Sequence, residues 1–427
     1  MSRETRSRLV ELRRELHAYP EPSWCEFHTT SRVVDELESI GVDRVALGDD
    51  ALDPAERMGV PDDDELARWR EAAAERGARD DVLERAAGGL TGAVAVLERG
   101  DGPTVGLRVD IDALRQTEAD GDDHAPAAAG FRSENEGVMH ACGHDAHTTV
   151  GLGTVAAVAE SDFAGTLVVF FQPAEEVVGG GRPMAATDHV EGIDHFLAVH
   201  VGLDHPTGEV VAGGDEALSV RQMTAEFVGE SAHAGAAPQA GRNAMQAVAA
   251  ATQNLYAIPR HAGGLTRVNV GRADVGSAPN VVAAEGRIEL EVRGGTDDLR
   301  AYMTTHAERT LDTAARMHDC TVTTETLAVA PREDSDESMV TAVAGAADAT
   351  PGIESTVRRA PLGVSEDATY LMRAVKQDGG DATFVVLGTD HPGGHHTARF
   401  DVDEETIGLG VDVLSTVIRR LGGEETG

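Results

Sequence analysis

The feature that most constrains the fold is an alternation of short apolar runs with helix-like segments, interrupted once. The alternation occupies residues 1–218 and resumes over residues 329–427. Strands are expected at 93–97, 104–109, 167–171, 196–201 and 384–388, and helices at 148–160 and 404–420. Strands that alternate with helices predict a mainly parallel sheet with helices on both faces.

The interrupting block, residues 219–328, has a different pattern. Strands are expected there at 223–229, 267–271, 281–293 and 321–326, and helices at 243–258 and 296–317. A block of this size is compatible with a self-contained domain. The predicted fold is therefore a doubly wound, mainly parallel α/β catalytic domain in two segments, 1–218 and 329–427, with an inserted α+β domain at 219–328.

Two segments near the start of the chain carry further expectations. Residues 5–40 predict one or two amphipathic helices, with Leu9, Leu12 and Leu16 on one stripe and a break near Pro20. Residues 49–85 are acidic, poor in aromatic residues and helix-favouring. We expect the latter to be a surface insertion outside the core.

The charge balance excludes some partners. The chain has 74 acidic and 36 basic residues, a formal net charge of −38, and Lys376 is its only lysine. Such a charge repels nucleic acid and anionic membranes, and it favours a salt-adapted, halophilic enzyme. The acidic residues are spread throughout rather than grouped in blocks, which argues against a mimic of nucleic acid.

Segments that would direct the chain to a membrane are not evident in the sequence. No run of about 18 apolar residues occurs, and the charged N-terminus lacks the apolar core of a signal peptide. These features predict a cytoplasmic protein.

The three cysteines are widely spaced and predict no disulfide framework. Cys142 differs from the others because Gly143 alone separates it from His144. A thiolate and an imidazole at this spacing can face one metal ion if the backbone turns at the glycine. Asp145 is expected to cap the helix that follows or to accept a hydrogen bond from His144.

Three other places put polar side chains after apolar runs. Glu175 and Glu176 follow the run at 167–171, His200 closes the run at 196–201, and His395 and His396 follow the run at 384–388. The carboxyl ends of strands are where α/β sheets place their sites. One carboxylate of the pair can bind a cation while the other takes a proton from water.

Each of these signals has an ordinary structural explanation. A single histidine among 17 is usually a satisfied core or surface residue, and paired acids are common in an acidic chain. Together, however, the four places supply sulfur, nitrogen and oxygen ligands from separate strand ends. That combination favours a two-metal hydrolase over a structural zinc site.

Several motifs resemble those of the aminoacylase/carboxypeptidase family of metallopeptidases. They are LHAYPEPSWCEF, LRVDIDALR, MHACGHDAHT, FFQPAEE, SAHAGAAPQAGRNA and GGHHTARFDVDEE. The resemblance covers nearly the whole chain in order. The insertion LDPAERMGVPDDDELARWREAA and the segment GVSEDATYLMRAV resemble the branch that hydrolyses p-aminobenzoyl-glutamate.

The resemblance implies two divalent metal ions per subunit, with manganese favoured and zinc possible. The implied ligands are Cys142, His144, Glu176, His200 and His396. His396 is preferred over His395 because the family places this ligand four residues before a phenylalanine, here Phe400. Glu175 falls on the position of the general base.

The resemblance also implies residues around the metal ions. Arg108 stands where relatives that lack the cysteine carry a ligand histidine, so Asp110 is expected to support the ligands through hydrogen bonds. His140 and His147 match no ligand position. His233 is expected to reach a neighbouring subunit's site, and Asn280 and Arg293 to contact the substrate carboxylate.

The implied function is hydrolysis of the amide bond of an N-acyl or N-aroyl amino acid, with p-aminobenzoyl-glutamate-like substrates favoured. The inserted domain would be a lid or dimerisation domain, and the protein a homodimer or a heterodimer with a related subunit. Three alternatives stay open: a broad aminoacylase or hippurate hydrolase, a non-catalytic metal- or ligand-binding protein, and an enzyme with Cys142 as nucleophile. Arg293 has its own alternative, a surface salt bridge.

Overall fold

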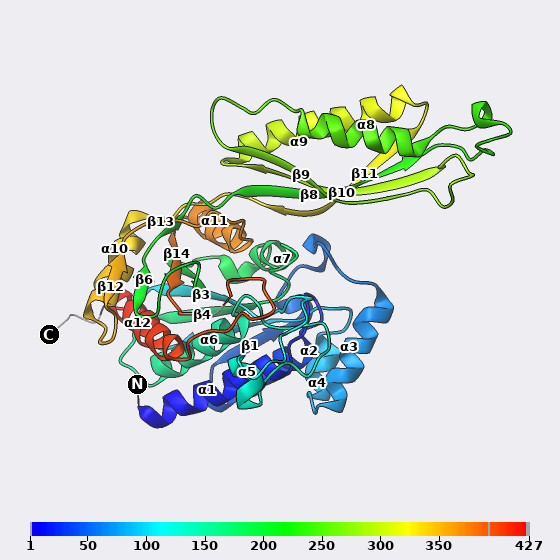
Figure 1. Ribbon diagram of the computed structural model, residues 1–427. Coiled ribbons are helices and arrows are strands. Elements are labelled where there is room, and N and C mark those ends of the chain that lie inside the picture. Colours follow the sequence, from blue (N-terminus) through cyan, green and yellow to red (C-terminus); the bar gives the residue numbers. More distant parts are fainter. Residues whose placement is uncertain (1, 392, 424–427) are drawn as a thin grey trace. The chain divides into compact units, whose positions relative to one another are not determined.

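The computed structural model describes residues 2–391 and 393–423, and the chain forms two compact units (Figure 1). As far as it is described, the first unit is Met1–Asp215, Glu333–Leu362 and Asp367–Gly427, and the second is Glu216–Arg332 with Gly363–Glu366. The short segment 363–366 is a part of the second unit that its sequence did not suggest.

The elements of the first unit follow one another as helices and short strands. Its helices are α1 (Arg3–Ala18), α2 (Phe27–Ile40), α3 (Asp63–Glu75), α4 (Asp80–Arg85), α5 (Ala125–Ala129), α6 (His144–Ala159), α7 (Gly181–Ala185), α10 (Glu337–Ala349), α11 (Ala368–Asp378) and α12 (Glu405–Leu421). Its strands are β1 (Arg44–Leu47), β2 (Ala93–Glu98), β3 (Thr104–Asp110), β4 (Thr166–Gln172), β5 (His195–Val201), β6 (Glu209–Val211), β7 (Gly214–Asp215), β12 (Ser355–Val357), β13 (Ala360–Pro361) and β14 (Asp381–Leu387).

The main sheet has the order β1-β2-β4-β3-β5-β14-β6-β12. Its centre, β4-β3-β5-β14, is parallel. The pairs β1-β2, β2-β4 and β14-β6 are antiparallel, and the edge strand β12 is parallel to β6. The predicted doubly wound, mainly parallel α/β fold is therefore confirmed, with antiparallel additions at both edges.

The second unit is an antiparallel sheet with two helices. Its elements are β8 (Ser219–Val228), α8 (Ala244–Tyr256), β9 (Thr266–Val275), β10 (Glu285–Gly294), α9 (Asp297–Met317) and β11 (Thr321–Ala330). The strand order β11-β8-β10-β9 with this βαββαβ succession matches the predicted α+β pattern.

A hydrogen bond joins the point where the chain leaves the first unit to the point where it returns. Asp215, at the end of β7, accepts a hydrogen bond through Oδ1 from the backbone N–H of Ser335 at 2.9 Å. The two ends of the long inserted segment are therefore neighbours within the first unit.

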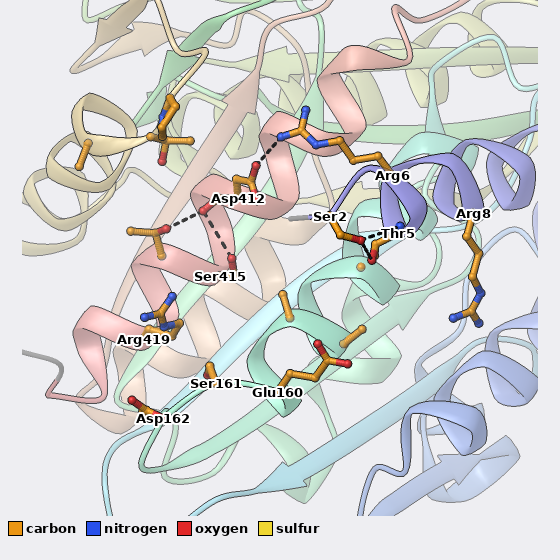
Figure 2. Close-up of a pocket in the computed structure, with 17 residues that line it drawn as sticks. Ser2, Thr5, Arg6, Arg8, Glu160, Ser161, Asp162, Asp412, Ser415 and Arg419 are labelled. Carbon is orange, nitrogen blue, oxygen red and sulfur yellow. Dashed lines mark hydrogen bonds and ion pairs between the residues drawn. The ribbon is translucent and has the colours of Figure 1, made fainter.

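A surface cavity of about 930 Å³ lies among the ends of α1, α6, α10 and α12 (Figure 2). Ser2, Arg6, Glu160, Asp412 and Arg419 are among the residues that line it. None of the residues expected to bind metal or substrate lines this cavity, so the site must be sought elsewhere.

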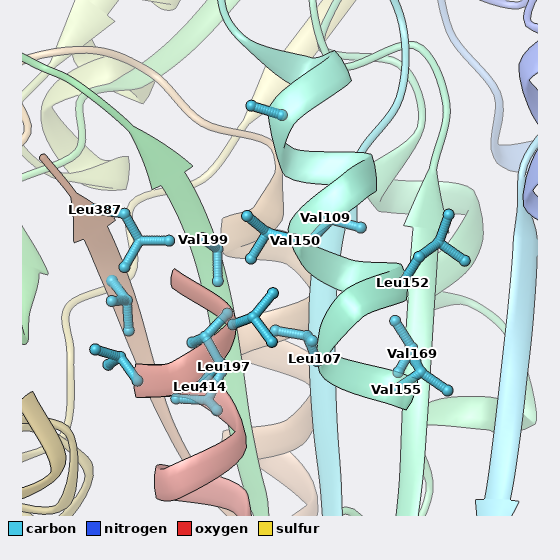
Figure 3. Close-up of a cluster of buried hydrophobic side chains, with 14 of the residues drawn as sticks. Leu107, Val109, Val150, Leu152, Val155, Val169, Leu197, Val199, Leu387 and Leu414 are labelled. Atoms are coloured by element: carbon cyan, nitrogen blue, oxygen red, sulfur yellow. The ribbon is translucent and has the colours of Figure 1, made fainter. Parts of the chain in front are cut away.

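Apolar side chains on alternate positions of the parallel strands form a buried cluster under α6 and α12. Figure 3 shows Leu107, Leu197 and Leu387 of the sheet facing Val150 of α6 and Leu414 of α12. Each such side chain stabilises the fold by about 1.5–3 kcal/mol through burial. A second cluster covers the opposite face with α7 and α11.

The expectation that residues 49–85 lie outside the core is wrong. Leu52, Leu66, Ala73 and Leu83 are buried and belong to the second cluster. These buried residues are few among many acidic ones, although Val60 of the same segment is exposed, so the average composition hid the contribution of the segment to the core. No helix in the described part of the chain combines the length and the apolar character that a bilayer-spanning segment needs.

Candidate metal centre

Several predicted site residues of the first unit lie at the carboxyl ends of its central strands. Asp110 ends β3, Glu175 and Glu176 follow β4 closely, and His200 is the last but one residue of β5. After β3 the chain passes through α5 to α6, which packs on one face of the sheet, and after β4 it continues into α7, which packs on the other. Such a switch of faces opens a crevice at the strand ends.

Gly143 provides the turn that places Cys142 and His144 together. Its φ is +88°, in the left-handed region, and it directly precedes α6. A Cβ at this position would lie 2.5 Å from Cγ2 of Val201. Glycine is therefore required here both for its conformation and for the close approach of β5.

Cys142 belongs to two clusters of possible metal ligands. One cluster is Cys142, His144 and His200, and the other is Cys142, Glu176 and His396; within each, the ligand atoms lie within 4.8 Å of one another. Cys142 Sγ is 3.4 Å from His200 Nε2. The Nδ1 atom of His200 lies 2.7 Å from the Val201 carbonyl oxygen, so that Nδ1 donates there and Nε2 faces the site.

Two buried atoms at the centre lack ordinary partners. His144 Nε2 and Glu176 Oε1 lie 3.7 Å apart, and neither has a hydrogen-bond partner among the described residues. His396 Nε2 is 3.5 Å from the other oxygen of Glu176. Buried polar atoms are rarely left in this state, and a divalent cation fits this set of sulfur, nitrogen and oxygen atoms.

Glu175 lies beside this set. Its side chain is buried, and it forms a further cluster with His144 and Glu176 within the same 4.8 Å limit. The two carboxylates of the Pro-Ala-Glu-Glu turn therefore both face the centre, which is the arrangement that one ligand and one base require.

The acceptor beside His144 is Asp112 rather than Asp145. Asp112 Oδ1 lies 3.1 Å from His144 Nδ1, and its other oxygen accepts a hydrogen bond from the backbone N–H of Glu176 at 3.1 Å. The sequence pattern did not single out Asp112, although its place two residues beyond the end of β3 was a signal.

Asp145 serves a buried ionic network instead. Its carboxylate is 2.7 Å from Arg13 Nε and 2.8 Å from His17 Nδ1. Its Oδ1 also accepts a hydrogen bond from the backbone N–H of Ala146. Because Asp145 follows His144 directly, this network anchors the first turn of α6 to α1.

Asp110 is held between Arg108 and His147. Arg108 Nη1 donates to Asp110 Oδ2 at 2.7 Å, and the other oxygen accepts from His147 Nδ1. His147 Nε2 accepts the backbone N–H of Val201 at 2.8 Å. Both ring nitrogens of His147 are thereby engaged, although it clusters with Asp110 and His144. His140 is buried and absent from every candidate ligand cluster of the described chain.

The site carries more buried carboxylates than positive charges. Burial raises the pKa of Glu176 to about 8. Burial alone would lower the pKa of His144, but Asp110 and Asp112 raise it to about 10. Burial, and then His147, lower the pKa of His200 well below its usual value. Cations would relieve the excess of negative charge and replace the proton on His144.

The three residues expected to bind substrate lie in the second unit. His233 and Asn280 are exposed, and the backbone N–H of Ala234 donates to the carbonyl oxygen of Asn280 at 3.0 Å. Arg293, the last but one residue of β10, forms a two-point contact with Glu291 at 2.8 and 3.0 Å. Their contact with substrate stays a prediction.

The profile of peptidase family M20/M25/M40 matches residues 106–420. The chain belongs to this family. The predicted family resemblance and the predicted enzyme class, a metallopeptidase-family hydrolase, are thereby confirmed.

Relatives within the M20 family align along nearly the whole chain. Indole-3-acetyl-aspartic acid hydrolase of Enterobacter agglomerans is 40% identical over 412 residues, covering 95% of this chain and 94% of the relative. One of the subunits of p-aminobenzoyl-glutamate hydrolase of Escherichia coli is 40% identical over 413 residues, covering 96% and 94%. The crystal structure of an aminobenzoyl-glutamate utilization protein from Klebsiella pneumoniae has a TM-score of 0.83 at 33% identity, covering 98% and 96%.

Proposed function

We propose that this M20-family chain hydrolyses the amide bond of N-acyl or N-aroyl amino acids at a centre of two divalent cations. The ligands would be Cys142, His144, Glu176, His200 and His396. The observation that carries the proposal is that the Cys142 sulfur belongs to two ligand clusters, with Glu175 beside them. Two clusters that share one sulfur suit a pair of neighbouring cations.

The residues of the chain would divide the chemistry between them. When bound, the cations would polarise the scissile carbonyl group and lower the pKa of a water molecule. Glu175 would take the proton of the attacking water on its carboxylate and deliver it to the departing amine nitrogen. Asp112 and Asp110 would keep His144 and its surroundings oriented.

The amino acid released is proposed to be acidic. The two relatives at 40% identity are named for amides of aspartate and of glutamate, and they align over nearly the same length. We favour p-aminobenzoyl-glutamate-like substrates, with an indole-acetyl-aspartate-like amide as the second candidate. Parallel assays of both, with hippurate as the test of a broad aminoacylase, would rank them.

His233, Asn280 and Arg293 are proposed to recognise the substrate. For Arg293 this requires a change of partner, because its guanidinium contacts Glu291 in the same geometry that would suit a substrate carboxylate. Replacing Arg293 with Lys should raise KM more than it changes kcat, since a lysine cannot form the two-point contact.

Metal identity and assembly complete the proposal. We favour manganese, with zinc the alternative that a thiolate ligand suits; metal analysis of the purified protein would decide.

A homodimer, or a pair with a related chain, is proposed because the Escherichia coli relative is named as one part of a larger enzyme. The roles of the inserted domain and the cytoplasmic location stay predictions. Salt adaptation is also a prediction, and for that reason the assays should be made in molar salt.

The proposal is tested by Glu175→Ala. The variant should keep its bound metal and lose at least about a hundredfold in rate, the usual loss of a general base. Glu191→Ala, which removes an exposed carboxylate of the first unit, should leave both unchanged. Full turnover by Glu175→Ala would discard the assignment, and a wild-type chain that binds metal without turnover would favour a non-catalytic binding protein.

A further inference from the structure

The segment that carries Glu175 and Glu176, residues 172–181, has a backbone that needs support from its surroundings. Ala174 and Val178 have φ values of +56° and +55°. The turn is tight, because Val178 N–H donates to the Glu175 carbonyl at 2.7 Å and Gly179 N–H to the Ala174 carbonyl at 2.9 Å. Residues with side chains adopt such φ values only where neighbouring groups impose them.

One buried carboxylate, that of Asp367, holds both ends of this segment. Its Oδ1 accepts hydrogen bonds from Gln172 Nε2 at 2.7 Å and from Arg108 Nη2 at 3.1 Å. Its Oδ2 accepts from the backbone N–H groups of Gly180 at 3.1 Å and Gly181 at 2.8 Å. The side chain is fully buried, and it does not cap α11, the helix that it precedes.

Close packing against backbone carbonyl groups excludes side chains at the second end of the segment. A Cβ at Gly180 would lie 1.7 Å from the carbonyl oxygen of Pro173, and one at Gly181 would lie 2.2 Å from that of Asp367. The two glycines therefore allow the segment to close on itself and on Asp367 at once.

Arg108 extends the support to the rest of the centre. Its Nε donates to Gln172 Oε1 at 2.8 Å, while Nη1 donates to Asp110. Asp110 in turn holds His147, which receives the N–H of Val201, the residue after His200. We call Asp367, Arg108 and Gln172 the loop clamp. It connects the segment after β4 with the ends of β3 and β5.

We propose that Asp367 is a positioning residue for Glu175 and Glu176, an inference that rests on the function proposed for this turn. The loop clamp fixes the strained segment so that one carboxylate reaches the cations and the other stays beside them. An aspartate is required because all four partners are donors. An asparagine would turn its NH₂ group toward a donor in either orientation.

The test compares Asp367→Asn with the wild-type full-length chain. Hydrogen–deuterium exchange of the metal-free protein should be faster across residues 172–181 and unchanged elsewhere in the first unit. Metal affinity, measured by competition with a chromophoric chelator, should fall by about 10- to 100-fold, as for other groups that orient metal ligands. With saturating metal, kcat should fall while KM changes little.

Glu21→Gln is the matched control. Glu21 is also a buried carboxylate that accepts two backbone N–H groups, those of His28 and Thr29 at 2.9 Å. The Glu21→Gln variant should leave metal affinity, kcat and hydrogen–deuterium exchange across residues 172–181 unchanged. If both variants lost metal affinity equally, the effect would be a general one of buried carboxylates and the proposal would fail.

A folded Asp367→Asn with wild-type exchange and metal affinity would also overturn the proposal. If that variant does not fold, Gln172→Met, which removes one anchor at nearly constant volume, carries the test, with a loss of about tenfold in metal affinity expected and no loss overturning the proposal. Exchange and affinity need no substrate. A wild-type chain without hydrolytic activity would therefore defeat the proposed function and still leave the loop clamp to be judged.

Discussion

Two ligand-bearing segments approach the centre in contrasting ways. Residues 172–181 are mostly buried and are held by Asp112 and the loop clamp. Residues 393–397 contain two glycines with φ near +90°, and the side chain of His396 is 57% exposed. Its backbone N–H donates to the carbonyl oxygen of Ala141 at 2.8 Å. The centre therefore has a fixed side that sets geometry and an open side that solvent reaches.

The largest effect should come from the atom that joins the two sides. Cys142→Ser removes the sulfur shared by both ligand clusters, so both metal positions should weaken together. Metal content and activity should fall by more than the roughly hundredfold that residues behind the ligands can cost. Metal analysis after dialysis checks this, and retention of two ions per chain would contradict a shared ligand.

His200→Ala and His396→Ala should separate the two sides directly. Each removes one imidazole and should lower metal affinity by more than about tenfold. Added imidazole should restore activity to the His396 variant, because that side chain is open to solvent, and not to the His200 variant, whose side chain is 2% exposed. Equal rescue of both would erase the contrast between a fixed and an open side.

The fixed side should also be sensitive to a single methyl group. Gly143→Ala combines a left-handed residue with a Cβ 2.5 Å from Val201, and it should destabilise the fold by about 3 kcal/mol. Gly130→Ala, at φ +79° with open space around it, should cost only about 1 kcal/mol. Urea unfolding of the metal-free proteins measures both, and equal costs would show that the close approach to β5 is unimportant.

The smallest effect concerns the pH dependence of Glu21, a buried carboxyl of the first unit that does not contact residues 172–181 in any hydrogen bond described above. Burial raises the pKa of Glu21 from 4.5 to about 7 in the folded chain. A raised folded-state pKa contributes stability that is complete below about pH 4.5 and is lost as the pH rises through about 7. Relative to Glu21→Gln, the wild type should therefore lose about 2 kcal/mol of unfolding free energy between pH 5.5 and 8. If the free energies of unfolding of the two proteins changed in parallel with pH, the pKa of Glu21 would not be raised in the folded chain.

The sequence predicted those parts of the fold whose pattern is local and long. The apolar run at 167–171 is β4, and the expected helix at 404–420 is α12. The strands β1 and β6 were missed because three or four residues show no periodicity, and these strands exist through pairing with β2 and β14.

The site shows the same division between local and distant information. Cys142, His144, Glu175 and Glu176 stand in compact motifs and could be singled out at once. Asp367 could not, because its partners are 186 to 259 residues away in sequence and no spacing rule connects them. The sequence motifs therefore predicted the proposed metal ligands and general base, whereas the residues that hold them in position could be identified only from the structure.

The hydrogen bond between Ser335 and Asp215 has a consequence for protein engineering. Since the chain leaves and rejoins the first unit at adjacent points, a linker of a few residues could bypass the whole excursion from Glu216 to Arg332. The shortened chain without this segment would keep Glu175 and every proposed metal ligand. Comparing it with the parent would assign to the missing segment whatever selectivity or assembly the shortened chain lacks.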